Sequence, residues 1–131
     1  MENKETDVIL NEIGQILSED EAYPSDDTLL FARLDYGMVA PSIFKNLPNH
    51  VLYRSPDLDS LGYALLDLWD EQPEGRRWAE MEYLIKDSKF DAVFVYPDQI
   101  DPEEDPMDRR TRIVRRYFGE KPIVYPQLGE E

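Results

Sequence analysis

The chain has no cysteine, one histidine and only six glycines in 131 residues. The lack of cysteine excludes a disulfide scaffold and any thiolate zinc site. No glycine-rich phosphate loop and no His-Glu-x-x-His pattern is present, so nucleotide-loop and zinc-protease chemistry find no support. His50 falls in a predicted turn with no cysteine to act beside it, and we interpret it as structural. We therefore expect a protein that is not an enzyme and that needs no cofactor.

Long apolar runs are also missing from the sequence. No window approaches 18 apolar residues, and the opening MENKETDVIL has neither the basic segment nor the apolar core of a secretory signal peptide. We expect a cytoplasmic protein that does not span a membrane. With 41% hydrophobic residues the chain is long enough to bury its own core, which predicts a single domain over residues 1–131.

Basic residues are scarce: 14 lysines and arginines stand against 29 aspartates and glutamates, for a net charge of -15. A molecule of this charge repels nucleic acid and anionic membranes and attracts basic partners. Five of the basic residues are arginines that fall close together, at positions 109, 110, 112, 115 and 116. The sequence therefore predicts a basic protein partner, with no nucleic-acid or membrane partner.

Hydrophobic spacing divides the chain into helices and strands. Helical periodicity predicts helices over residues 6–17, 56–72 and 106–118, the second capped by Ser55 ahead of Pro56 and the third by Asp105 ahead of Pro106. Alternating or β-rich runs predict strands over 29–34, 38–44, 51–53, 78–86 and 91–96, while 123–125 fits a short strand or a frayed end. The order α-β-β-β-α-β-β-α predicts an α+β two-layer sandwich, an antiparallel sheet of about five strands with helices packed on one face.

The helix predicted over 56–72 is acidic on one side. Projected at 100° per residue, its polar residues lie opposite one apolar stripe, which consists of Leu58, Leu61, Leu65, Leu68 and Trp69. Tyr63 falls among the carboxylates, where it suits an anchor for a basic protein. The alternative is that Tyr63 leans on a neighbouring loop and that the acids form a solvated face. The predicted partner-binding residues of this helix are Asp59, Tyr63, Asp67, Asp70 and Glu71.

A proline-containing segment, residues 98–108, is predicted to be an exposed acidic loop. It lacks the central glycine and the terminal glutamate of an EF-hand, so we expect no dedicated metal site, although adventitious binding of a divalent cation remains open. Carboxylates imitate a nucleic-acid backbone only if this loop and the acidic helix share one face, which the sequence does not determine. The predicted partner-binding residues of the loop are Asp98, Asp101, Glu103, Glu104 and Asp105.

The clustered arginines lie on a predicted amphipathic helix, where residues 109, 112, 115 and 116 fall opposite the apolar side. We expect them to be neutralised within the molecule, by Asp105 and Asp108 at a spacing of four and by the acidic loop folding back on the same face. Homodimer contacts and polyanion binding are the alternatives, and the net charge opposes the second.

A series of short motifs runs through residues 78–118. In order they are Trp78 ahead of a strand, Asp87-Ser88-Lys89-Phe90, the run Ala92 to Tyr96 followed by Asp98, a proline-containing acidic loop, and Asp108-Arg109-Arg110 opening a helix that ends in Tyr117-Phe118. This series resembles the YezG-like family of bacterial immunity proteins, the small acidic antitoxins of polymorphic toxin systems. The resemblance implies a cytoplasmic protein that binds and blocks a co-produced toxin, typically a nuclease, and it brings no catalytic residues.

The leading hypothesis from the sequence is a non-enzymatic immunity protein that occludes a basic toxin domain through an acidic surface. The alternative is a homo-oligomeric structural or regulatory module without a toxin partner, in which the arginine helix of one copy meets the acidic face of another. A carboxylate-based, metal-dependent enzyme is the third possibility. We expect a monomer or a weak homodimer.

Overall fold

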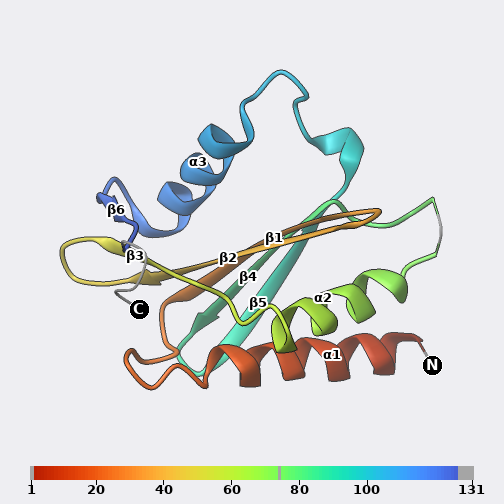
Figure 1. The fold of residues 1–131 in the computed structure, drawn as a ribbon, viewed down its shortest axis with the longest axis horizontal. Coiled ribbons are helices and arrows are strands. Elements are labelled where there is room, and N and C mark those ends of the chain that lie inside the picture. The colour runs from red at the N-terminus through yellow and green to blue at the C-terminus, as the bar shows by residue number, and fades with distance from the viewer. Residues whose placement is uncertain (1, 74, 127–131) are drawn as a thin grey trace.

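The computed structural model describes residues 2–73 and 75–126, with side chains from Thr6 onward. Within these residues the chain forms three α-helices, six strands and one 3-10 turn (Figure 1). In chain order they are α1 (Glu2–Leu17), β1 (Thr28–Asp35), β2 (Met38–Asn46), β3 (Val51–Arg54), α2 (Ser60–Asp70), β4 (Glu80–Lys86), β5 (Lys89–Val95), η1 (Pro97–Gln99), α3 (Pro106–Phe118) and β6 (Ile123–Val124).

The strands form one open sheet in the order β5-β4-β1-β2-β3-β6. Neighbouring strands are antiparallel except β3 and β6, which pair in parallel. The predicted turn between β1 and β2 is present, and its Gly37 has φ 75°, a left-handed conformation that glycine adopts without strain. The α+β fold and the predominantly antiparallel sheet are thus confirmed, and residues 123 and 124 add a sixth strand.

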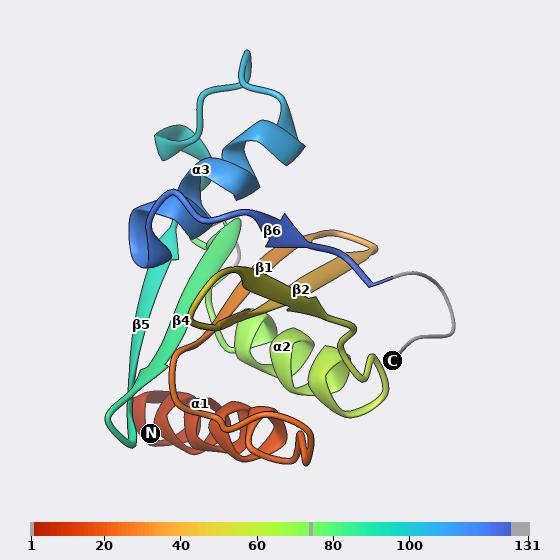
Figure 2. The same cartoon turned by 90° about the vertical axis from the view of Figure 1, so that its left-hand side faces the viewer.

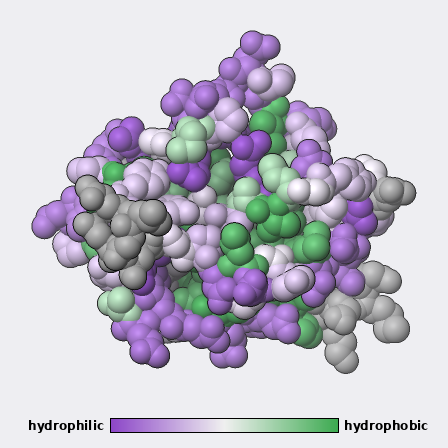
Figure 3. All heavy atoms as spheres, in the orientation of Figure 1, coloured by the Kyte–Doolittle hydropathy of each residue, from purple (hydrophilic) through white to green (hydrophobic). Residues whose placement is uncertain are grey.

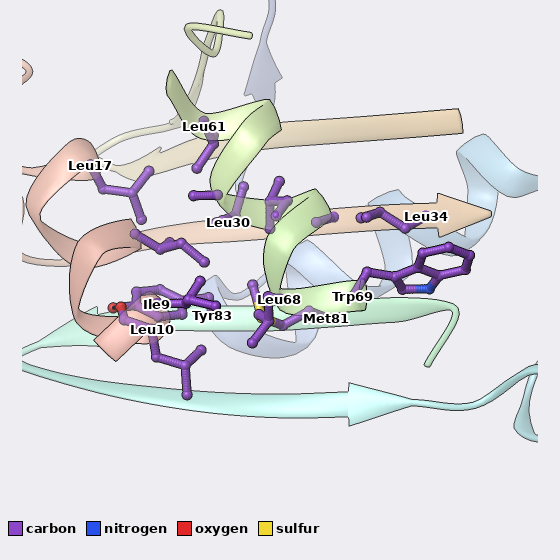
Figure 4. Close-up of a cluster of buried hydrophobic side chains, with 14 of the residues drawn as sticks. Ile9, Leu10, Leu17, Leu30, Leu34, Leu61, Leu68, Trp69, Met81 and Tyr83 are labelled. Carbon is purple, nitrogen blue, oxygen red and sulfur yellow. Dashed lines mark hydrogen bonds between the residues drawn. The ribbon is translucent and has the colours of Figure 1, made fainter. Parts of the chain in front are cut away.

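Helices α1 and α2 pack side by side on one face of the sheet, as expected, and α3 packs on the other face (Figure 2). On the first face, Leu30 and Met81 belong to the large core beneath α1 and α2 (Figure 4). On the second face, Leu29 and Phe44 pack with Val114 of α3. Because side chains of a strand alternate between faces, burial of both Leu29 and Leu30 requires cover on both sides of β1.

The predicted N-terminal caps of two helices have different outcomes in the structure. Helix α3 begins as predicted, because the Asp105 carboxylate accepts hydrogen bonds from the backbone N–H groups of Met107 and Asp108. The predicted cap at Ser55 is wrong: α2 begins at Ser60, and Asp59 at its N-cap position makes no side-chain cap. The position of α2 is therefore set by packing of its apolar face more than by a cap.

One hydrogen bond ties α1 to the sheet. The hydroxyl of Tyr83, a fully buried residue of β4, donates to the backbone carbonyl of Leu10 at 2.7 Å (Figure 4). Burial raises the pKa of Tyr83 to about 12. The helix can approach this closely because residue 14 is glycine: a Cβ there would lie 2.7 Å from the Tyr83 oxygen.

Candidate partner-binding surface

Acidic charge is segregated by layer in the folded chain. Among the residues whose side chains are described, 6–27 and 55–73 contain twelve carboxylates and no lysine or arginine; they hold α1 from Thr6 onward, α2 and the segments that flank both helices. The remaining ones, 28–54 and 75–126, contain 12 acidic and 13 basic residues and are close to neutral. Hydrophilic side chains accordingly dominate the lower edge of the molecule in Figure 3, where α1 lies in Figure 1. We name residues 6–27 and 55–73 the acidic layer.

Tyr63 stands out from the acidic layer with 71% of its surface exposed. It lines a shallow hollow between α1 and α2, together with Glu12, Gln15 and Asp67. The predicted grouping of Tyr63 with carboxylates is therefore present in the structure, and α1 contributes to it. Sequence reasoning missed Glu12, an exposed residue of α1 that lies to one side of the buried Ile9 and Ile13.

Several apolar side chains are exposed in the same layer. Leu58 is 59% exposed, Val8 49% and Leu66 36%. The expectation that Leu58 belongs to the buried stripe of α2 is wrong, because this residue lies before the first residue of the helix. A polar layer that leaves aromatic and aliphatic groups in water has the composition of a protein-binding surface, with apolar anchors inside a charged rim.

The predicted acidic residues of α2 differ in how free they are. Asp59 and Asp67 are exposed. Asp70 is exposed as well, and its carboxylate lies 3.8 Å from the guanidinium of Arg77. Glu71 is half-buried at the C-terminal cap of the helix. Asp59 and Asp67, with Tyr63, are thus the predicted residues that the structure leaves most available to a partner.

The predicted residues of the acidic loop make more hydrogen bonds and ion pairs within the molecule than those of α2 do. Glu104 pairs with Arg112 at 2.8 Å and with Arg109 at 3.6 Å, and the hydrogen bond from Arg112 lowers its pKa. Asp105 caps α3, and Asp101 accepts a hydrogen bond from the backbone N–H of Glu103. Asp98 and Glu103 are exposed. The loop meets α2 where Pro97, Ile100 and Pro102 line a cavity together with Trp69.

Arginines of α3 face the sheet as well as the loop. The Arg109 guanidinium donates to both carboxylate oxygens of Glu80 at 2.9–3.1 Å, and Arg116 pairs with Glu82. Both glutamates belong to β4 and are buried. A buried carboxylate needs a charged or hydrogen-bonding partner, and α3 supplies one to each.

The expected internal neutralisation of the arginines is confirmed for Glu104 of the acidic loop. Among the ion pairs of the described residues, none joins Asp105 or Asp108 to an arginine, so that part of the expectation is wrong. Arg110 has no carboxylate partner among these ion pairs: its guanidinium donates to the Ser42 hydroxyl and lies 5.6 Å from the centre of the Tyr125 ring. The arginine helix is thus largely an internal structural element.

Within residues 2–73 and 75–126, no three histidine, aspartate or glutamate side chains converge in a way that would hold a metal ion. In the same part of the chain, no helix is long and apolar enough to cross a membrane. No family model and no curated protein matches the chain.

Proposed function

We propose that this protein is a non-enzymatic bacterial immunity protein that binds a basic toxin domain through its acidic layer and occludes the active cleft. The observation that carries the proposal is the segregation of charge: the acidic layer holds twelve carboxylates and no basic residue, and Glu12 and Asp67 lie beside its exposed Tyr63. Three of the twelve, Asp20, Asp27 and Asp70, pair with basic residues outside the layer. The resemblance of residues 78–118 to the YezG-like immunity family supports the same proposal. A nuclease is the favoured toxin, because its substrate-binding cleft must be basic.

The physical argument concerns both the rate and the affinity of binding. A field concentrated on one face steers an oppositely charged partner toward that face, which raises the association rate at low salt. Carboxylates of Glu12, Asp59 and Asp67 then stand in for substrate phosphates. Tyr63 supplies apolar contact area at the centre, where desolvated aromatic residues contribute most to affinity.

The internal pairing of the arginines favours this reading over a homo-oligomer. A head-to-tail oligomer needs a free basic surface to meet the acidic layer of the next copy. Arg109, Arg112 and Arg116 are instead held by glutamates of the same chain. We therefore propose a monomer that acts on a different, basic protein in the cytoplasm.

The experiment uses the toxin domain encoded beside this gene and measures its association rate with the immunity protein at low and high salt. We expect the double reversal Asp59→Lys/Asp67→Lys to slow association at low salt by about tenfold or more. The matched control is Asp98→Lys/Glu103→Lys, which makes the same change of charge at exposed positions of the loop. The control should have a smaller effect, and both variants should keep the circular dichroism spectrum of the native fold.

Tyr63→Ala separates anchoring from steering. We expect this variant to dissociate faster with an almost unchanged association rate, because the side chain is uncharged. Equal effects of the helix and loop reversals would reject the acidic layer as the binding surface. An association rate indifferent to salt would reject steering, and a neighbouring toxin that does not bind would reject the function itself.

A further inference from the structure

A cavity of about 400 Å³ lies at the border of the acidic layer, where the β1–β2 hairpin, the end of α2 and the loop after β5 meet. Trp69 and Leu34, which both line it, lie together at one end of the core in Figure 4. The loop turns its apolar Pro97, Ile100 and Pro102 to the cavity. This volume suits a small ring-bearing molecule.

Aromatic rings and a guanidinium form one wall of the cavity. Tyr36 and Trp69 meet edge to face with their ring centres 5.1 Å apart. The Arg77 guanidinium lies over the Trp69 ring at 4.6 Å and donates to the Tyr36 hydroxyl at 3.4 Å. The cation is thus held in place by flat apolar surfaces, which is an arrangement that orients a guanidinium toward a planar anion.

Two buried N–H donors at the cavity lack an acceptor. Trp78 is 1% exposed, and its indole Nε1 is buried without a hydrogen-bond partner, as is Nε of Arg77. The other indole is satisfied, because Trp69 Nε1 donates to the Trp78 carbonyl at 2.8 Å. A buried donor without an acceptor is unfavourable. Both donors belong to residues that line the cavity, and each donor atom is itself covered by protein.

Charged groups of both signs surround the cavity. Arg33 lines it with a side chain 40% exposed, and its Nε lies 3.8 Å from Glu80, a carboxylate already bound by Arg109. Asp35 is the acidic residue of the lining, and Asp70 lies 3.8 Å from the Arg77 guanidinium. An anionic ligand therefore finds two guanidinium groups here, and it competes with Asp70 for Arg77.

We propose that this cavity is a binding site for a carboxylate carried on an aromatic ring. The carboxylate pairs with the guanidinium of Arg77, whose side chain is 20% exposed, and the ring packs among Tyr36, Trp69 and the loop prolines. A bare phosphate would leave the apolar walls unfilled, and a cation would face the guanidinium groups. The carboxylate can belong to a free small molecule or to the C-terminal aromatic residue of a peptide, since both present the same groups.

Tryptophan fluorescence reports on this site directly, because the two tryptophans of the chain, Trp69 and Trp78, both line the cavity. We expect phenylacetate to change the emission saturably at millimolar concentration or below, and phenylacetamide to bind at least about tenfold more weakly. A short peptide ending in phenylalanine, compared with its C-terminal amide, tests the second source. Tighter binding of the free peptide than of phenylacetate would support the site and identify a chain terminus as the ligand.

Arg77→Gln should weaken phenylacetate binding by about tenfold or more, because it removes the guanidinium that meets the carboxylate. Arg76→Gln is the matched control: Arg76 is the adjacent arginine, it is exposed and it does not line the cavity, so affinity should stay unchanged. In the native protein, the indole N–H resonance of Trp78 should move on binding, because this residue lines the cavity. No saturable response to either carboxylate, equal binding of acid and amide, or equal effects of the two arginine variants would overturn the proposal.

Discussion

The buried ion pair of Glu80 and Arg109 tests how α3 is held on the sheet. The Glu80 side chain is 1% exposed and that of Arg109 is 12% exposed, and three donor–acceptor distances between them are 2.9–3.1 Å. The Glu80 carboxylate raises the pKa of Arg109. The guanidinium stays charged even when this partner is removed, because arginine is always protonated in proteins. Loss of one member of a buried pair costs about 3–5 kcal/mol. Glu104 lies 3.6 Å from the same guanidinium and compensates in part, so we expect Glu80→Leu to lose about 3 kcal/mol.

Removing the other partner should have a similar effect. Arg109→Met leaves the buried Glu80 carboxylate with Arg33 at 3.8 Å. The double variant Glu80→Leu/Arg109→Met replaces the pair with apolar groups of similar size, and we expect it to return to within about 1 kcal/mol of the native protein. Arg112→Met on the same helix is the control, because the side chain of Arg112 is 55% exposed and its pair with Glu104 should contribute little to stability.

Urea unfolding followed by far-ultraviolet circular dichroism at neutral pH measures the free energy of unfolding of each variant. A loss of about 3 kcal/mol is large against the roughly 5–15 kcal/mol that stabilises a typical domain, so the effect is well within reach of this assay. The reasoning is refuted if Glu80→Leu is no less stable than Arg112→Met, or if the double variant loses as much as its two single changes together.

Two further predictions concern α1 and the segment after it. Gly14→Ala should destabilise the fold, because the new Cβ would lie 2.7 Å from the Tyr83 oxygen, and this clash outweighs the roughly 1 kcal/mol by which alanine favours a helix over glycine. In a Tyr83→Phe background, which lacks this oxygen, the same change should stabilise the fold. Gly62→Ala in α2 should also stabilise it, because a Cβ at residue 62 meets nothing within 4 Å. Thermal unfolding checks this reversal of sign, and stabilisation by Gly14→Ala alone would contradict it. Burial raises the pKa of Asp20, but hydrogen bonds from Arg54 and a backbone N–H outweigh this and leave the pKa below 3.8. A carboxyl whose pKa is lower in the folded state contributes stability above its unfolded pKa of about 3.9 and loses it as the pH falls through the folded value. Asp20→Asn should therefore lower the melting temperature at neutral pH and converge with the native protein in acid, and a pH-independent difference would count against the pairing.

The elements that the sequence predicts well depend on neighbours close in the chain. Helix α3 begins after Asp105 and ends before Gly119, which has φ 88° and whose N–H donates to the Arg115 carbonyl. These are contacts within a few residues, so residue types at fixed spacing are enough to indicate them. The start of α2 was missed because Ser55 offers a cap signal that the packing of the helix does not use.

The partners of α3 could not be predicted in this way. The alternation of Glu80 and Glu82 with Met81 and Tyr83 is typical of a strand with one face in water. In the structure a helix from later in the chain covers that face and pairs with both glutamates. The continuous apolar run in β1 is the sequence signal that both faces of the sheet are covered.

The sequence by itself determined the net charge, the absence of cysteine chemistry, the order of helices and strands, and the acidic face around Tyr63, because these follow from composition and from spacing within one element. The tertiary structure decided which charges remain available. It brings α1 beside α2, so that two separate acidic segments form one layer, and it pairs Arg109 and Arg116 with buried glutamates of β4. It also assembles the cavity at Trp69, Arg77 and Trp78 from segments distant in the chain. Such juxtapositions depend on long-range packing, which no local pattern of residues specifies.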